Sequence, residues 1–181
     1  MTATPAAPTD VTQAPEPFQG VPPPTLAELK GALGRFATGV TIVTASGADG
    51  EPVGITANSF NSVSLSPALV LWSVAHTAGS FAVFTQARHY AIHVLSAEQR
   101  PLAERFATRG VDRWAGVRWH RNEAGVPILD GALALFECRS RSQYPEGDHV
   151  ILVGEVERCS QPGQGGPLLY HGGRFYTEHP L

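Results

Sequence analysis

Short apolar stretches separated by turn-forming residues run through most of this chain, and they constrain its fold more than any other feature. Strands joined by turns such as Asp49-Gly50, with only a few helices between them, are typical of a closed or split β-barrel. Strands do not alternate with helices and no GxGxxG motif occurs, so the pattern excludes a Rossmann domain. The expected strands cover about residues 40–45, 52–57, 60–66, 68–74, 90–95, 133–142, 149–158, 168–171 and 174–177.

Three short helices are expected beside these strands. The segment Thr25–Glu28 fits a capping box, in which the Glu28 side chain reaches back to the Thr25 amide, so the first helix begins there. The other helices are expected at residues 77–85 and 97–108, and Ser96 begins the second of these. Apolar residues at three- and four-residue spacing form one stripe along the first helix: Leu26, Leu29, Leu33 and Phe36.

The first 24 residues contain seven prolines and few apolar side chains. This composition predicts a disordered or loosely draped tail over residues 1–24, followed by one domain over residues 25–181. The tail lacks a basic segment followed by an apolar one, so it does not fit a secretory signal. Since no apolar run approaches the ~18 residues of a membrane span, a cytoplasmic location without membrane contact is expected.

Charge and cysteine content exclude two further classes of function. The formal net charge is −3 and there is no long basic run, which argues against nucleic-acid binding. Cys138 and Cys159 form no CxxC pair, and both thiols are expected to be buried or half-buried in neighbouring strands. His89 and His93 have HxxxH spacing, but they fall in or beside an expected strand without a third ligand, so no metal site is predicted.

The segment from Gly54 to Ser73 is unusually rich in hydroxyl and amide side chains for a pair of strands. An almost wholly apolar run, residues 68–72, follows these polar residues, and Pro67 marks a turn. Asparagine is not favoured in strands. The pattern fits either the polar outer face of an edge strand or a binding site for a polar ligand with many hydrogen-bonding groups. A nucleotide with a ribityl-phosphate chain is such a ligand.

Four segments together make the chain resemble the short-chain NAD(P)H:flavin reductase family, the reductase components of two-component flavin-dependent monooxygenases. The segments are TGVTIVTA (38–45), GITANSFNSVSLSPALVLWS (54–73), YAIHVLS (90–96) and GDHVILVGEV (147–156). The resemblance implies a mainly β fold, namely an FMN-binding split β-barrel of Greek-key type with a few short flanking helices. It also implies hydride transfer from nicotinamide to the flavin isoalloxazine, with FAD or FMN and with NADH in preference to NADPH.

The same resemblance implies which residues form the site. His149 is expected to place the nicotinamide. Arg174 pairs with a phosphate of the nicotinamide cofactor or with a group across a dimer, or is a surface arginine. An aromatic residue follows Arg174 in the family, and Tyr176 or Phe175 fits. Thr77 and Ser80 are expected either to hold a phosphate or to serve as first-turn and capping residues. The flavin-contacting residues would be Thr56, Ala57, Asn58, Ser59, Ser62, Val63, Ser64, Ser73, Thr77, Ser80 and Phe81.

Assembly and partners follow from the resemblance as well. A homodimer is expected, also because apolar residues such as Val70, Leu71 and Trp72 exceed what one small barrel covers. The partner is a flavin-dependent monooxygenase that receives reduced flavin. Two alternatives stay open: an oxidase of the pyridoxamine-phosphate-oxidase type, and a flavin-binding module without nicotinamide turnover. Glu155 and Glu157 alternate along an expected strand, which indicates a solvated face rather than an acid/base pair.

Overall fold

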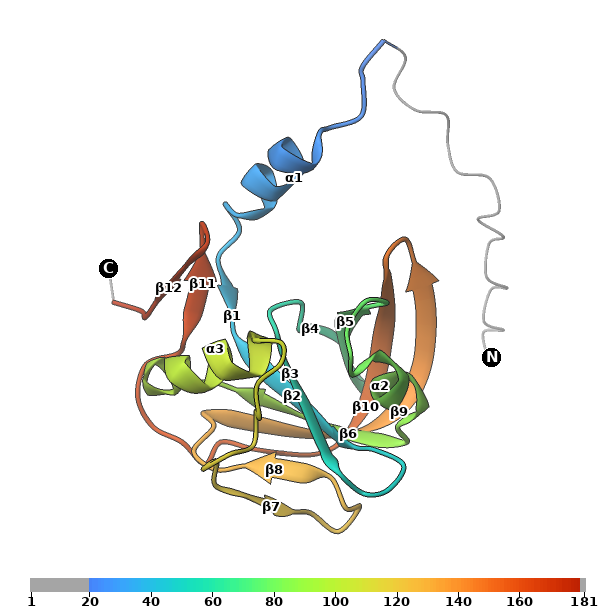
Figure 1. Cartoon of the computed structure of the whole chain (residues 1–181), viewed down its shortest axis with the longest axis vertical. Coiled ribbons are helices and arrows are strands. Elements are labelled where there is room, and N and C mark those ends of the chain that lie inside the picture. The colour runs from blue at the N-terminus through green and yellow to red at the C-terminus, as the bar shows by residue number, and fades with distance from the viewer. Residues whose placement is uncertain (1–19, 180–181) are drawn as a thin grey trace, which may run out of the picture.

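Seven antiparallel strands form one curled sheet in a computed structural model that describes residues 20–179 (Figure 1). The order across the sheet is β3-β2-β6-β9-β10-β5-β4. Most of the expected tail, residues 1–19, lies outside the described residues. The sheet strands are β2 (Thr41–Ser46), β3 (Pro52–Ala57), β4 (Asn61–Leu65), β5 (Ala68–Ala75), β6 (His89–Val94), β9 (Ala134–Glu146) and β10 (His149–Ser160).

Five shorter strands form two small sheets, and short helices flank the large one. The first small sheet has the order β1-β11-β12, and β7 pairs with β8 in the second. These strands are β1 (Thr38–Gly39), β7 (Trp119–Arg121), β8 (Pro127–Leu129), β11 (Leu169–His171) and β12 (Arg174–Tyr176). The helices are α1 (Leu26–Leu33), α2 (Phe81–Gln86), the 3-10 turn η1 (Ala97–Gln99) and α3 (Arg100–Ala107).

The two edge strands of the large sheet are joined by only three residues. Strand β3 ends at Ala57 and β4 begins at Asn61, yet these strands lie at opposite edges of the sheet. Three linking residues span at most ~14 Å. The sheet therefore curls until its edges face each other, and residues 58–60 cross the seam between them.

The main core lies inside this curl. Along β5 every second side chain points inward, so Val70, Trp72 and Val74 are buried, and Trp72 packs edge-on against Phe84 of α2 with ring centroids 4.9 Å apart. The expectation that Val70 and Trp72 form an uncovered apolar surface is therefore wrong. The sequence shows an unbroken apolar run there, and only the sheet decides which face each residue takes.

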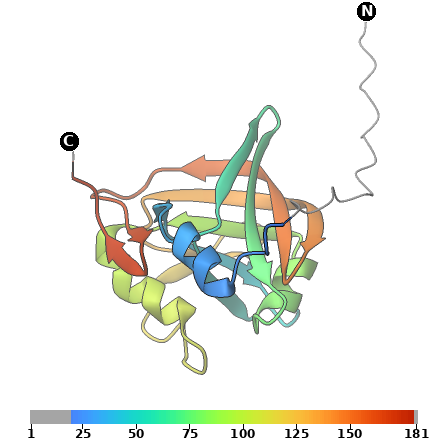
Figure 2. The same ribbon diagram turned by 90° about the horizontal axis from the view of Figure 1, so that it is seen from above.

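Most of the large exposed apolar side chains lie instead on or beside α1 and on β4. Helix α1 has the expected capping box at Thr25 but buries none of its residues. It stands apart from the curled sheet (Figure 1), and the β4–β5 hairpin also projects from the body (Figure 2). At the hairpin, Leu65 is 94% exposed. The large exposed apolar side chains of these two elements are Leu26, Leu29, Leu33, Val63 and Leu65, with Phe36 just after α1.

Several elements differ from the sequence-based expectations. Helix α2 begins at Phe81 rather than at residue 77, and η1 precedes α3 within the expected 97–108 helix. The segment 109–126 contains the small strand β7, which pairs with β8. Cys138 is buried in β9, but Cys159 is exposed near the end of β10. Among the described residues, we find no helix long and apolar enough to cross a membrane.

Candidate functional site

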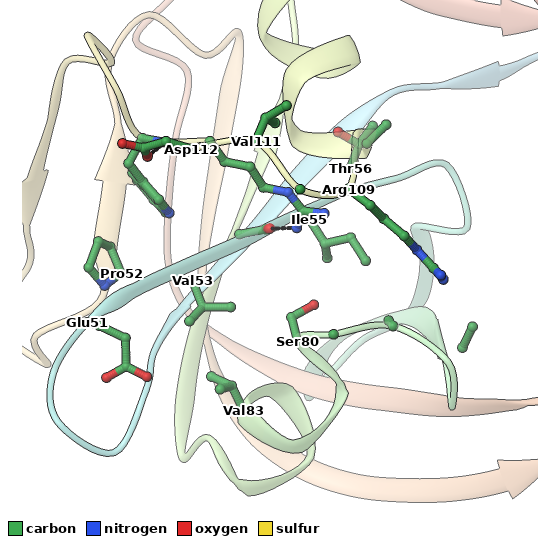
Figure 3. Close-up of a pocket in the computed structure, with 18 of the residues that line it drawn as sticks. Glu51, Pro52, Val53, Ile55, Thr56, Ser80, Val83, Arg109, Val111 and Asp112 are labelled. Atoms are coloured by element: carbon green, nitrogen blue, oxygen red, sulfur yellow. Dashed lines mark hydrogen bonds between the residues drawn. The ribbon is translucent and has the colours of Figure 1, made fainter.

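A cavity of about 880 Å³ lies between β3, the turn before α2 and the loop after α3 (Figure 3). We call it the β3–α2 cavity. Strand β3 contributes residues 52–56, the β5–α2 turn contributes Ala75 and residues 77–80, and Val83 comes from α2. Residues 109–114 of the loop form the opposite wall.

A second cavity of about 470 Å³ shares Thr56 and Ala107 with the first. We call it the β3–β12 cavity, because Ala57 and Asn58 at the end of β3 and Phe175 of β12 line it. The two cavities together follow β3 to the seam of the sheet. Of the expected flavin-contacting residues, this groove brings together Thr56, Ala57, Asn58, Thr77 and Ser80.

Two of the expected hydroxyl groups are already bonded within the protein. The Thr56 hydroxyl donates to the Ala103 carbonyl at 2.6 Å and so ties β3 to α3. The Ser59 Oγ accepts from the Ser73 amide at 2.9 Å and also lies 3.3 Å from the Ser73 carbonyl. The Thr56 hydroxyl therefore holds the groove wall, whereas Ser59 and Ser73 bond to each other and line neither cavity.

Ser80 differs from these residues because its hydroxyl is left without a partner. The residue is only 7% exposed, and its Oγ is buried without a hydrogen bond. It precedes α2 but does not cap that helix. A buried hydroxyl without a partner is costly, so the Ser80 Oγ on the wall of the β3–α2 cavity suits an absent polar ligand.

Strand β4 carries three expected contacts that lie outside both cavities. Ser62 and Val63 are exposed and Ser64 is half-buried on this edge strand. The Ser64 hydroxyl accepts from the Ser66 amide at 3.2 Å. Phe81 is half-buried at the start of α2, where its ring lies 4.9 Å from that of His76. None of these four side chains lines the groove in the described chain.

His149 opens β10 directly opposite Ala75, which lines the β3–α2 cavity. Its Nδ1 lies 2.6 Å from an Asp148 carboxylate oxygen, and the His76 amide donates to the Asp148 carbonyl at 3.0 Å. The bond from His149 lowers the pKa of Asp148, and the charges of His149 and His76 act in the same direction. Asp148 thereby engages Nδ1 of the ring, and His149 itself lines neither cavity in the described chain.

Strand β12 turns Phe175, one of the two aromatic residues expected there, toward the groove. Phe175 lines the β3–β12 cavity, whereas Arg174 and Tyr176 are exposed on either side of it. The guanidinium of Arg100 lies 5.4 Å from the centre of the Phe175 ring. Since side chains alternate along a strand, Phe175 takes the inward position that the sequence alone left open.

Sequence reasoning missed the loop that closes the β3–α2 cavity. Arg109, Arg113 and Trp114 all lie in the polar segment 109–126, which was not expected to hold site residues. The Arg113 guanidinium donates to the carbonyl of Gly54 at 2.8 Å and to that of Thr108 at 3.0 and 3.1 Å. No local motif marks such residues, because their partners lie far away along the chain.

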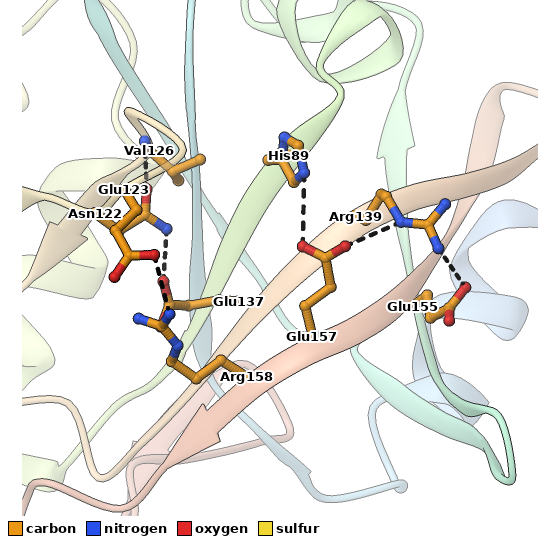
Figure 4. Close-up of polar contacts among 9 residues, drawn as sticks. All are labelled: His89, Asn122, Glu123, Val126, Glu137, Arg139, Glu155, Glu157 and Arg158. Carbon is orange, nitrogen blue, oxygen red and sulfur yellow. Dashed lines mark hydrogen bonds and ion pairs between the residues drawn. The ribbon is translucent and has the colours of Figure 1, made fainter.

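The outer face of β9 and β10 carries charged side chains that pair with one another (Figure 4). Arg139 contacts Glu155 and Glu157, each at 3.0 Å, and Glu157 also lies 3.6 Å from His89. Arg158 lies 3.4 Å from Glu123. Glu155 and Glu157 therefore form the expected solvated face, and no acid/base pair.

His93, the other histidine of the HxxxH spacing, is fully buried in β6. Its Nδ1 lies 3.0 Å from the Ile42 carbonyl, and its Nε2 accepts from the Leu129 amide at 3.0 Å. Both ring nitrogens are thus used to join β2, β6 and β8. Burial lowers the pKa of His93 to about 4, so the ring is neutral and structural.

Comparison with known proteins shows what this chain is similar to. The family described as "Flavin reductase like domain" matches residues 33–179. The chain is 49% identical over 146 residues to "FMN reductase (NADH) SmoA" of Agrobacterium fabrum, covering 81% of this chain and 82% of that protein. It is 43% identical over 152 residues to the reductase component of the flavin-dependent trigonelline monooxygenase of Acinetobacter baylyi. That match covers 84% of this chain but only 49% of the relative.

A solved structure shows the same similarity in three dimensions. It is the NADH:FAD oxidoreductase SgcE6 of Streptomyces globisporus in complex with NAD and FAD fragments. The TM-score is 0.79 at 41% sequence identity, and the match covers 85% of this chain and 93% of that structure.

Proposed function

The chain belongs to the flavin reductase-like domain family, and on that premise we propose that it is an NADH-dependent flavin reductase of FAD or FMN. The observation that carries the proposal is the groove along β3, with the unpartnered Ser80 hydroxyl in its wall and His149 paired in the sheet with the lining residue Ala75. The relatives named for FMN and FAD reduction with NADH support this assignment and favour NADH over NADPH.

The residues of the groove suit a flavin by size and by chemistry. Cavities that bind cofactors commonly measure about 300–1,000 Å³, and the β3–α2 cavity falls within that range. Small residues at Ala57 and along 77–80 let the backbone approach a flat ring system. Thr77 and Ser80 supply hydroxyl groups for the polar chain of the nucleotide.

The reaction needs positioning more than acid–base chemistry. A hydride, which carries two electrons, would move from the nicotinamide ring carbon of NADH to a flavin ring nitrogen. A solvent proton would complete the reduced flavin, and NAD⁺ would be the other product. His149, held through Nδ1 by Asp148, presents Nε2 to the nicotinamide carboxamide and fixes that ring. The walls formed by β3 and residues 109–114 hold the flavin against it.

The fold supports the same assignment. The curled sheet, whose edge strands are joined by residues 58–60, supports the split β-barrel that the resemblance implies. We assign the exposed apolar face of α1 and of the β4 edge to a homodimer interface. An isolated helix of eight residues is marginal in water, so α1 needs a partner surface for its leucines. Ser62, Val63 and Ser64 would then meet a ligand only at that interface.

The reduced flavin passes to a separate monooxygenase, as the relatives named as reductase components support.

The proposed reductase activity can be tested directly. Purified chain is mixed with NADH and FMN or FAD without oxygen, and the nicotinamide band is followed together with the flavin band. Loss of both bands in a one-to-one ratio is expected, with slower loss for NADPH. Flavin that binds without any loss of NADH would instead favour a carrier module.

A further inference from the structure

One wall of the β3–α2 cavity is a loop, residues 109–114, rather than a strand or a helix. Val111 and Asp112 of this loop lie across the cavity from Ser80 and Val83 (Figure 3). The other walls are fixed by the hydrogen bonds of β3 and α2. The width of the cavity therefore depends on how the loop is held.

Arg113 ties the loop to β3, which is an edge strand of the large sheet. Its Nη1 donates to the Gly54 carbonyl at 2.8 Å, and its Nε and Nη2 donate to the Thr108 carbonyl at 3.1 and 3.0 Å. All three nitrogens of the guanidinium thus donate to backbone carbonyls. Because the guanidinium is planar and its donors form a rigid fork, these bonds fix both the direction and the distance of the side chain.

Gly54 is also the point where the ring of Phe106 in α3 packs on the sheet. A Cβ on Gly54 would collide with the Phe106 ring and would lie 3.3 Å from Cζ2 of Trp114. Phe106 is fully buried, and Trp114 packs edge-on against it with ring centroids 5.1 Å apart. The absence of a side chain at Gly54 therefore lets these rings, and the loop that carries Trp114, lie close to β3.

The hydrogen bond and the ring packing both hold the loop at Gly54. We propose that Arg113 is a positioning residue for flavin binding, which acts through the Gly54 carbonyl and sets the width of the β3–α2 cavity. It acts by geometry and not by its charge, since each of its nitrogens is bonded to the backbone. The proposal rests on the proposed function for the identity of the ligand.

Equilibrium binding of riboflavin and FMN, measured by flavin fluorescence, tests the role without turnover. Riboflavin lacks the phosphate, so a change in cavity width affects both flavins, whereas a lost attraction between charges affects FMN alone. Arg113→Gln should weaken both by a similar factor, about five- to 50-fold. Gly54→Ala changes no charge and should also weaken both. Arg118→Gln, at an exposed arginine of the same loop outside this cavity, should change neither and is the matched control.

Steady-state kinetics and melting temperatures separate positioning from a purely structural role. Arg113→Gln should raise the KM for flavin and leave kcat within about twofold, as expected when binding is lost equally from the ground state and the transition state. A lower melting temperature with unchanged flavin affinity would show that Arg113 only stabilises the fold, and would overturn the proposal. Weakening of FMN without weakening of riboflavin would assign the effect to charge and would overturn it as well.

Arg113→Lys keeps the charge but lacks the fork, so it should leave both flavins weakened. Full recovery by lysine would contradict a geometric role. If Arg113→Gln does not fold, the lysine variant carries the same comparison of riboflavin with FMN. A wild-type chain whose flavin binding depends on Arg113 but which does not oxidise NADH would overturn the proposed function alone. NADH oxidation by the wild type, with equal flavin affinity in all variants, would overturn the positioning role alone.

Discussion

Ser59 Oγ accepts a hydrogen bond from the Ser73 amide at 2.9 Å and thereby ties the seam of the curled sheet to β5. Ser59 belongs to the three residues that join the edge strands β3 and β4. The residue that the resemblance implies as a flavin contact therefore has a structural role at the seam.

Replacing Ser59 should affect the stability of the fold more than the rate of flavin reduction. In Ser59→Ala the half-buried Ser73 amide loses its side-chain partner, which costs about 1–2 kcal/mol of unfolding free energy. Ser62→Ala, on the exposed edge strand β4, should change the unfolding free energy by less than about 0.5 kcal/mol. Urea unfolding of the two variants measures this difference. Equal unfolding free energies would show that the hydrogen bond between Ser59 and Ser73 contributes nothing to stability.

His149→Ala should slow flavin reduction by NADH and leave flavin affinity nearly intact. Loss of one positioning hydrogen bond costs ~1–3 kcal/mol, or roughly five- to 150-fold in rate. Asp148→Asn should give a smaller decrease, because the amide still accepts from Nδ1 but no longer attracts the ring by charge. His120→Ala, an exposed histidine outside the groove, serves as control. Stopped-flow flavin bleaching as fast as in the wild type would remove His149 from the mechanism.

The burial of His93 makes stability depend on pH in a defined window. The pKa of about 4 in the folded chain lies below the usual value of 6.5, because burial, and to a lesser extent the charge of His120, disfavour the imidazolium. The unfolded chain therefore binds a proton that the folded chain does not. Stability is fully present above about pH 6.5 and falls as the pH approaches 4, by about 3 kcal/mol in all.

The variant His93→Gln isolates this contribution from that of the carboxylates. It should be less stable at neutral pH, but its unfolding free energy should fall less between neutral pH and pH 4 than that of the wild type. His120→Gln should keep most of the wild-type pH dependence, because that ring is exposed. Denaturant titrations at a series of pH values give the slope of the unfolding free energy against pH for each variant. Parallel slopes for wild type and His93→Gln would contradict the assignment.

Gly154 and Tyr90 should show strong energetic coupling. A Cβ on Gly154 would collide with the Tyr90 hydroxyl in the core, and that hydroxyl is buried without a hydrogen-bond partner. Gly154→Ala should destabilise the chain by about 1–3 kcal/mol through overpacking. Tyr90→Phe should be neutral or stabilising, since it removes an unpartnered buried group. In the Tyr90→Phe background Gly154→Ala should cost clearly less, and a strictly additive double-mutant cycle would refute the contact.

The apolar face of α1 should control assembly. Leu29→Glu combined with Leu33→Glu places charges in the proposed interface and should convert a dimer to a monomer in sedimentation equilibrium. Ala27→Glu, on another face of the same helix, should leave the dimer unchanged. If the double variant keeps the mass of the wild type, or if the wild type is itself a monomer, α1 is not part of such an interface.

Local sequence determined the elements and where several of them begin. Thr25 and Glu28 make the predicted capping box, Ser96 and Gln99 make the second, and alternation or turn residues mark most strands of the large sheet. These features depend on neighbours within a few residues, which is why the sequence alone suffices. The resemblance in four motifs likewise pointed to the family that the comparisons show.

Tertiary structure decided which side chains of those elements meet. The inward positions of Val70 and Trp72, the bridge from Ser59 to Ser73, and the reach of Arg109 to Thr77 each depend on residues brought together by the curl of the sheet. Nothing in the polar segment 109–126 marks it as a cavity wall. A hydrogen bond or a buried face is set by distance in space, and the curl of the seven-stranded sheet sets that distance.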